Sequence, residues 1–85
     1  MRIDKFLKVS RILKRRTIAK ELADNDRILV NGKIAKPSSE VNVKDLITVI
    51  FGQRRLTVQV ESTREYAKKE DAPLMYTVIE EKFGE

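Results

Sequence analysis

The dipeptide Asn31-Gly32 constrains the fold of this chain more than any other feature of its sequence. It stands between two short apolar runs, Ile-Leu-Val at 28–30 and Lys-Ile-Ala at 33–35. Asn-Gly is the pair that best fits the positive φ angles of a two-residue type I′ turn, so residues 28–35 are predicted to form an antiparallel hairpin. Pro37 cannot donate to a strand ladder, and the return strand should therefore be brief and lie at a sheet edge or corner.

Two further strands are predicted in the second half of the chain. Residues 46–51 (LITVIF) are apolar on both faces, as expected of a strand in the middle of a small sheet. Residues 52–55 should turn the chain, and residues 56–61 then alternate apolar and polar side chains, the pattern of a half-buried strand. Residues 74–79 are predicted to dock back on the sheet, whereas the acidic end, 80–85, should fray.

The N-terminal segment has helical periodicity. Residues 2–13, placed on a helix, gather four apolar side chains on one arc and put Asp4 among the cations on the other side: Ile3, Phe6, Leu7 and Leu13 against Lys5, Lys8 and Arg11. A second helix is predicted over 17–23, with Ile18, Ala19, Leu22 and Ala23 buried, ending at Asp24-Asn25-Asp26. The expected fold class is α+β, with two N-terminal helices packed on a small, twisted, mostly antiparallel sheet and a short C-terminal extension.

Positive charge is concentrated at one end of the chain. The net charge is +5, yet residues 1–36 hold eleven Lys or Arg against four Asp or Glu, and the remaining residues hold seven against nine. A solvated helix face is the simplest interpretation. However, the cationic side of the first helix has only Asp4 to relieve its repulsion, and a concentrated positive field attracts polyanions. The pattern favours a surface that binds a polyanionic partner.

The composition argues against catalysis and against membrane insertion. There is no histidine and no cysteine, which excludes thiolate chemistry and removes the commonest zinc ligand and general base. No glycine-rich phosphate loop and no carboxylate set with metal-binding spacing is visible, so neither an enzyme nor a cofactor or metal is expected. No apolar run approaches the roughly 18 residues of a membrane span, and Met1 leads directly into charged sequence. We expect a cytoplasmic protein.

The aromatic residues help to choose between kinds of nucleic acid. Phe6 and Phe51 fit the core, while Tyr66 and Tyr76 fit either the core or the surface. Few aromatic rings are therefore available for stacking on single strands. Structured RNA recognised by its shape and its phosphate backbone is the favoured ligand.

Several segments, in their order and spacing, resemble the RNA-binding domain named after small-subunit ribosomal protein S-four. They are RIDKFL at 2–7, RTIA at 16–19, ILVNGK at 28–33, and the residues at 37–38 and 45–47, so that the resemblance covers about residues 1–50. Among short members of this class, residues 2–6, residues 14–17 and the Met-Tyr-Thr at 75–77 before a Glu-rich close are similar to the RqcP-like family, which is related to the heat-shock protein of fifteen kilodaltons.

The resemblance implies a function in ribosome quality control. Members of that family bind large ribosomal subunits obstructed by peptidyl-tRNA, contact 23S rRNA and tRNA, and assist a partner protein that adds alanine tails to the stalled chain. Two positions depart from the family pattern. Lys44-Asp45 stands where Gly-Asp is frequent, and Asp26 stands where the second helix often ends in glycine. Both departures affect turn conformation and leave the cationic surface untouched.

The residues carried over as RNA contacts come from the basic end of the chain: Arg2, Lys5, Lys8, Arg11, Lys14, Arg15, Arg16 and Lys33. Arg16 is the strongest choice, because it begins the second helix beside the basic face of the first. An ion pair between Arg16 and Asp4 that orients the helix corner is the alternative, and the two roles are compatible. Lys36 borders the hairpin, and Arg54 and Arg55 suit either a second RNA element or simple solubility.

Residues 1–61 are expected to form the RNA-binding domain and residues 62–85 a charged extension partly docked on the sheet. Residues 62–71 themselves suggest a short exposed helix or a mobile loop. The chain is expected to be a monomer associated with ribosomes. Two other functions remain open at this stage: a general structured-RNA or DNA-binding module without ribosomal preference, and a membrane-surface protein that uses its basic helix.

Overall fold

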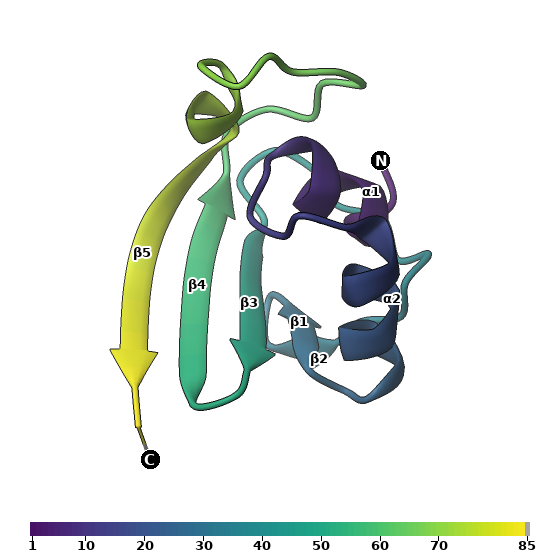
Figure 1. Ribbon diagram of the computed structural model, residues 1–85, viewed down its shortest axis with the longest axis vertical. Helices are drawn as coiled ribbons and strands as arrows, with labels where there is room; N and C mark the ends of the chain where they lie inside the picture. Colours follow the sequence, from purple (N-terminus) through teal and green to yellow (C-terminus); the bar gives the residue numbers. More distant parts are fainter. Residues whose placement is uncertain (85) are drawn as a thin grey trace.

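A computed structural model of the chain describes residues 1–84 and confirms the predicted α+β class. Helices α1 (Ile3–Val9) and α2 (Arg16–Asp24) lie beside a sheet with the strand order β2-β1-β3-β4-β5, in which every neighbouring pair is antiparallel (Figure 1). The strands are β1 (Ile28–Val30), β2 (Lys33–Ile34), β3 (Leu46–Phe51), β4 (Arg54–Val60) and β5 (Tyr76–Phe83), with a 3₁₀ turn, η1 (Ala72–Met75), before the last.

The hairpin turn predicted at Asn31-Gly32 is confirmed. The φ angles are 52° at Asn31 and 83° at Gly32, the two positive values that a type I′ turn requires. The Asn31 side chain also fastens the turn to the start of β3: its Oδ1 accepts a hydrogen bond from the Leu46 amide at 2.9 Å, and its Nδ2 donates to Asp45 at 3.1 Å. The return strand β2 is only two residues long and forms a sheet edge, as the nearby Pro37 indicates.

Helix α1 is shorter than the 2–13 predicted from periodicity. It ends at Val9, and Arg11 then adopts a left-handed backbone with φ of 63°, which turns the chain out of the helix. Leu13 nevertheless stays in the core, because its amide donates to the Leu7 carbonyl at 3.0 Å and folds the chain back under the helix. The apolar residues were thus assigned correctly to the core, although one of them lies beyond the helix.

Helix α2 agrees with its prediction to within one residue at each end. It closes with the hydrogen bonds of a Schellman motif, Arg27 N to Leu22 O at 2.8 Å and Asp26 N to Ala23 O at 3.1 Å. Asp26, at φ of 60°, occupies the left-handed position where glycine is usual. The prediction that Ile18 is buried was wrong, because its side chain is 39% exposed and α2 packs through the small residues Ala19 and Ala23.

The C-terminal strand corrects two expectations about the far end of the sheet. The segment 80–83 does not fray but continues β5 against β4, with Arg54 opposite Phe83 and Leu56 opposite Glu81. Arg54 and Arg55 belong to β4 and not to the preceding turn. Arg54 lies 4.8 Å from the Phe51 ring centre and 5.9 Å from that of Phe83, and its Nε donates to Glu81. Glu85 lies outside the described residues.

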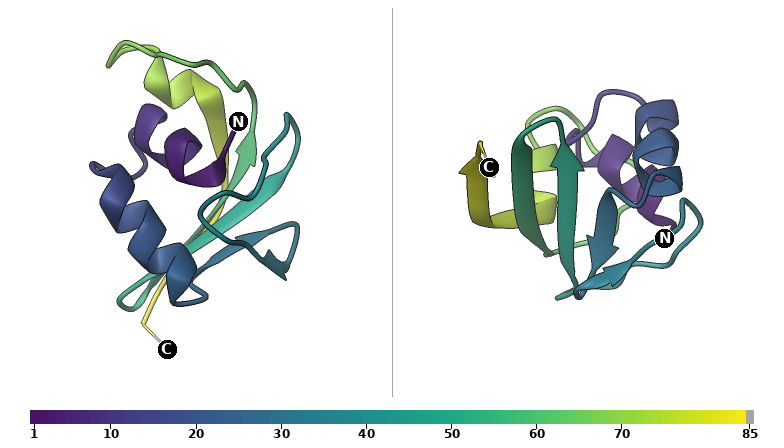
Figure 2. Two further views of the ribbon diagram at one scale, coloured as in Figure 1. Left: turned by 90° about the vertical axis from the view of Figure 1, so that its right-hand side faces the viewer. Right: turned by 90° about the horizontal axis from the view of Figure 1, so that it is seen from below.

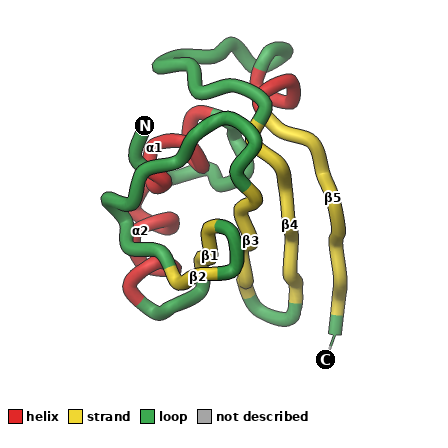
Figure 3. Tube along the Cα trace, turned by 180° about the vertical axis from the view of Figure 1, so that it is seen from behind, coloured by secondary structure: helices red, strands yellow, loops and turns green. Residues whose placement is uncertain are grey.

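The helices cover only part of the sheet. In Figures 1 and 3, α1 and α2 lie on the β1–β3 side, and β5 is the edge strand furthest from them. The core between the layers is built from side chains of both helices and of the three central strands, including Ile3, Phe6, Ile28, Ile47 and Val58. Within residues 1–84, no helix is long and apolar enough to cross a bilayer.

The connection from β4 to η1 passes over α1 without forming the short helix considered from the sequence (Figure 2). The structure thereby brings part of the C-terminal extension beside the basic helix. Before β3, Lys44 adopts φ of 80°, a left-handed backbone that glycine takes more readily than lysine. Asp26 and Lys44, the two positions where the sequence suggested altered turns, therefore both have backbone that favours glycine.

Candidate nucleic-acid interface

A buried carboxylate organises the corner between α1 and α2. Asp4 has no exposed surface, and it accepts hydrogen bonds from Arg2 Nε at 3.2 Å, Arg2 Nη2 at 3.1 Å and Arg16 Nη2 at 3.3 Å. The sequence placed Asp4 among the cations on the exposed side of α1, and this was wrong. The ion pair between Asp4 and Arg16 that it offered as an orienting contact is present.

The ionisation of Asp4 depends on these arginines. Burial alone would raise its pKa, but the hydrogen bonds from Arg16 and Arg2, together with the positive charge of both guanidinium groups, outweigh burial and lower the pKa from its usual 3.8. Asp4 is therefore an anion at neutral pH. One negative charge between two arginines leaves the corner with a net positive charge, and it holds both guanidinium groups in fixed positions.

The chain before α1 is also held in place. The Ile3 amide donates to the Ser39 carbonyl at 2.7 Å, and the terminal ammonium of Met1 pairs with Glu40 at 2.9 Å. An isolated β-bridge joins Arg2 to Glu40. These contacts fix the backbone at Arg2, and its hydrogen bonds to Asp4 hold its guanidinium at the helix corner.

Arg16 remains available for a ligand although it contacts Asp4. Its side chain is 42% exposed, and its Nε is buried without a hydrogen-bond partner among the described residues. Arg15 is the N-cap residue of α2 and is exposed, as is Lys14 in the connection before it. Guanidinium groups that converge on one corner can contact phosphate oxygens on a single RNA backbone, which is the geometry arginine suits best.

The remaining predicted contacts on α1 face the C-terminal extension. Lys5 forms an ion pair with Glu65, and the hydrogen bond and positive charge of Lys5 lower the pKa of that exposed carboxyl. Lys8 and Arg11 are exposed at the other end of α1, where they line a groove with Tyr66. Lys5 is therefore partly neutralised, whereas no ion pair to Lys8 or Arg11 is found within residues 1–84.

Lys33 lies away from this corner. It begins β2, and the chain that follows it borders the C-terminal turn of α2, near Ala23 and Asp24, instead of the N-terminus where Arg16 stands. The structure thus brings together seven of the eight cations predicted as RNA contacts, on α1, on the start of α2 and on their connection: Arg2, Lys5, Lys8, Arg11, Lys14, Arg15 and Arg16.

Sequence reasoning missed the contribution of the extension to this surface. Glu65 and Tyr66 lie more than fifty positions from α1, and no local periodicity connects them to it. The one available signal was Tyr66, a large aromatic within a highly charged stretch. Residues 1–84 contain no group of three carboxylates placed to hold a metal ion, and the arrangement as a whole suits binding of a phosphate backbone.

Comparisons with known proteins agree with this geometry. A family model described as the S4 domain matches residues 1–47. The RQC P-site tRNA stabilizing factor of Bacillus subtilis is 58% identical over the full length of both chains. The protein of the same name from Streptococcus pneumoniae is 53% identical over 95% of this chain and 92% of its own.

A solved structure supports the fold independently of these names. Heat Shock Protein 15 of Vibrio cholerae, described as trimeric, superposes with a TM-score of 0.84 at 28% identity. The superposition covers 92% of this chain and 80% of that one. Because it extends well beyond residue 47, the similarity in fold includes residues outside the segment matched by the family model.

Proposed function

The chain belongs to the S4 domain family and, within it, to the group that contains the RQC P-site tRNA stabilizing factors, and from this premise we propose that it is a ribosome quality-control factor. In this proposal it binds large ribosomal subunits obstructed by peptidyl-tRNA, in the cytoplasm. There it contacts 23S rRNA and the tRNA, and it assists a partner protein that adds alanine tails to the stalled nascent chain.

The observation that carries the RNA-binding part of the proposal is the Asp4-centred corner. Asp4 fixes Arg2 and Arg16 at hydrogen-bond distances of 3.1 to 3.3 Å while both side chains stay more than two-fifths exposed. Preorganised arginines lose less side-chain freedom when they bind phosphate, which favours affinity. The corner is the part of the molecule that we assign to the RNA backbone, with Arg15 and Lys14 beside it.

The proposed role requires no chemistry from the chain. A protein that holds a tRNA in place needs affinity for two RNA surfaces and a rigid connection between them. We propose that the chain acts as a monomeric adapter, with residues 1–61 as the RNA-binding domain and residues 62–85 as its extension. Its contribution to alanine tailing is then to retain the peptidyl-tRNA on the subunit while the partner works.

Binding to purified large subunits, with and without peptidyl-tRNA, tests the proposed function. Both kinds of subunit are titrated at several salt concentrations, with an unrelated duplex RNA as competitor. We expect tighter binding to the obstructed subunits, resistance to the competitor, and an affinity that falls steeply with salt, as displaced counterions require. Equal affinity for both kinds of subunit, together with full competition by the duplex, would instead identify a general structured-RNA-binding module.

A further inference from the structure

We propose that the groove between α1 and the connection from β4 to η1 binds a single unpaired nucleotide of RNA, its base stacked on Tyr66 and its phosphate held by Lys8 and Arg11. This groove, called the α1 groove below, has a volume of about 210 Å³ and is lined by Lys8, Val9, Arg11, Glu65, Tyr66 and Ala67. The inference rests on the proposed RNA-binding function and adds a second contact, of a different kind, to the arginine corner.

Tyr66 supplies the stacking surface. Its side chain is 75% exposed, although the neighbouring Ala67 is buried and anchors the backbone at this point. Stacking of a base on an exposed aromatic ring removes both surfaces from water and favours binding. Every base has a face that can stack. Phe6 is the one aromatic residue in the N-terminal half of the chain, and it is wholly buried. The stacking ring therefore comes from the extension.

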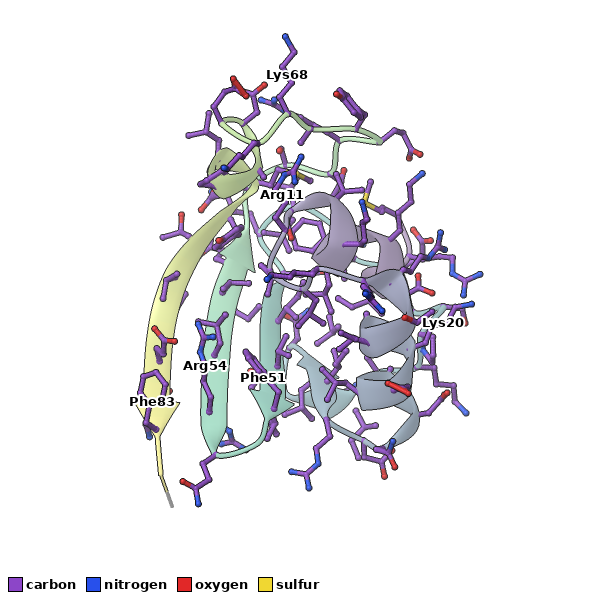
Figure 4. The ribbon with its side chains drawn as sticks, viewed as in Figure 1. Arg11, Lys20, Phe51, Arg54, Lys68 and Phe83 are labelled. Atoms are coloured by element: carbon purple, nitrogen blue, oxygen red, sulfur yellow. The ribbon has the colours of Figure 1, made fainter. Side chains whose placement is uncertain are left out.

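The charges that line the α1 groove favour a phosphate. Lys8 and Arg11 are exposed and have no ion-pair partner within residues 1–84, and the one carboxylate in the lining, that of Glu65, is neutralised by Lys5. Arg11 also has the left-handed φ of 63°, a conformation that is strained for a non-glycine residue and is often found at functional sites. That backbone places Arg11 beneath the connection, with Lys68 above it (Figure 4).

The ion pair between Lys5 and Glu65 holds the two sides of the groove together. It links α1 to residue 65 across 60 positions of sequence, next to Tyr66. The ring and the two cations are therefore presented by elements that are bonded to each other, and the groove exists before a ligand arrives. Inside a paired stem both faces of a base are stacked, so the base offered to Tyr66 is that of an unpaired nucleotide.

Binding of stem–loop RNAs by purified variants tests the inference. One probe carries a single unpaired adenosine beside its stem, and the matched probe lacks only the base at that position. We expect the unaltered protein to prefer the probe with the base. Tyr66→Ala should lose that preference, with a fall in affinity of roughly fivefold or more, the low end of base–aromatic stacking. Tyr66→Phe should retain it, because the phenyl ring still stacks.

A fluorescent variant gives a readout that a purely structural role for Tyr66 would not produce. The chain contains no tryptophan, so Tyr66→Trp introduces a single reporter. We expect its emission to be quenched by the probe with the adenosine and to change little with the probe that lacks the base. Equal emission changes with the two probes would overturn the inference.

The design separates this inference from the proposed function. The double variant Arg15→Ala, Arg16→Ala should weaken binding of both probes, because it removes contacts to the phosphate backbone. Tyr66→Ala should weaken only binding of the probe with the base. If Tyr66→Ala and the unaltered protein bind both probes alike while the double variant binds neither, the nucleotide site is refuted and the RNA-binding corner stands.

Discussion

Replacing Asp4 by asparagine should destabilise the fold by about 2 kcal/mol, because the substitution removes a buried anion and leaves its shape almost unchanged. Asp4 accepts three hydrogen bonds from two guanidinium groups, and hydrogen bonds to charged groups contribute about 1.5 to 3 kcal/mol each. The expected loss of stability is smaller than the sum of the three hydrogen-bond energies, for two reasons. Asparagine keeps one acceptor oxygen, and water screens Arg2 and Arg16, whose side chains are 45% and 42% exposed.

The expected loss is readily measured in a domain of this size. A destabilisation of about 2 kcal/mol corresponds to a fall in Tm of roughly 8 to 16 °C. Thermal and urea unfolding at pH 7, followed by circular dichroism, give the two values. The matched control is Asp24→Asn at the exposed end of α2, which removes the same charge and should change stability by less than about 0.5 kcal/mol.

The dependence on pH provides a second check of the same reasoning. The pKa of Asp4 is lower in the folded state than its usual 3.8, so the unfolded state binds more protons in the acid range and the stability of the unaltered protein falls as pH decreases. The contribution of the charged Asp4 is complete above about pH 5 and is lost as pH falls through the lowered pKa. Asp4→Asn and the unaltered protein should therefore converge at low pH. A difference below about 0.5 kcal/mol at pH 7, or one that grows towards acid pH, would refute the assignment.

Substitutions at three further positions test how the fold is held together. Asp26→Gly should raise stability by about 0.5 to 1 kcal/mol in urea unfolding, and Asp26→Ala should lower it, because glycine alone takes the left-handed position without strain. Arg54→Ala should destabilise by about 1 kcal/mol and speed amide exchange in β5, since Arg54 joins the Phe51 and Phe83 rings across three strands. Asn31→Ala should cost about 1 to 2 kcal/mol, because it removes both side-chain hydrogen bonds of the hairpin turn and a residue suited to positive φ.

The elements that could be predicted are those whose sequence pattern lies within a few neighbouring residues. The alternation of residues 56–61 and the Asn-Gly turn each carry the signal within a few positions, and the structure has a strand and a turn there. The early end of α1 has no such signal, because Arg11 takes a left-handed backbone without being glycine. The extension of β5 to Phe83 depends on a cross-strand pair, Glu81 with Arg54, which is recognised only once the register is known.

The candidate site also has a part that could be predicted, its cations, and a part that could not, the position of Asp4. The concentration of cations is visible in their positions along the sequence, and seven of the eight predicted contacts lie on or beside α1, at the start of α2 and in their connection. The position of Asp4 could not be predicted, because helical periodicity assumes that one face of α1 is in water. The first turn of this seven-residue helix instead packs against the segment around Ser39 and against Arg16, which buries the carboxylate. The contacts of Asp4 with Arg16 and of Lys5 with Glu65 join residues far apart in the chain, and no local sequence pattern predicts them.

Co-sedimentation of variants with obstructed large subunits tests the central claim most directly. The unaltered protein, the double variant Arg15→Ala, Arg16→Ala and the control Lys82→Ala, which removes an exposed cation on β5, are compared after circular dichroism has shown that each is folded. We predict that the unaltered protein and Lys82→Ala travel with the subunits, whereas the double variant, having lost contacts of about 1.5 to 3 kcal/mol each, stays in the light fractions. A folded double variant that sediments with the subunits as the control does would contradict the assignment of the arginine corner to RNA.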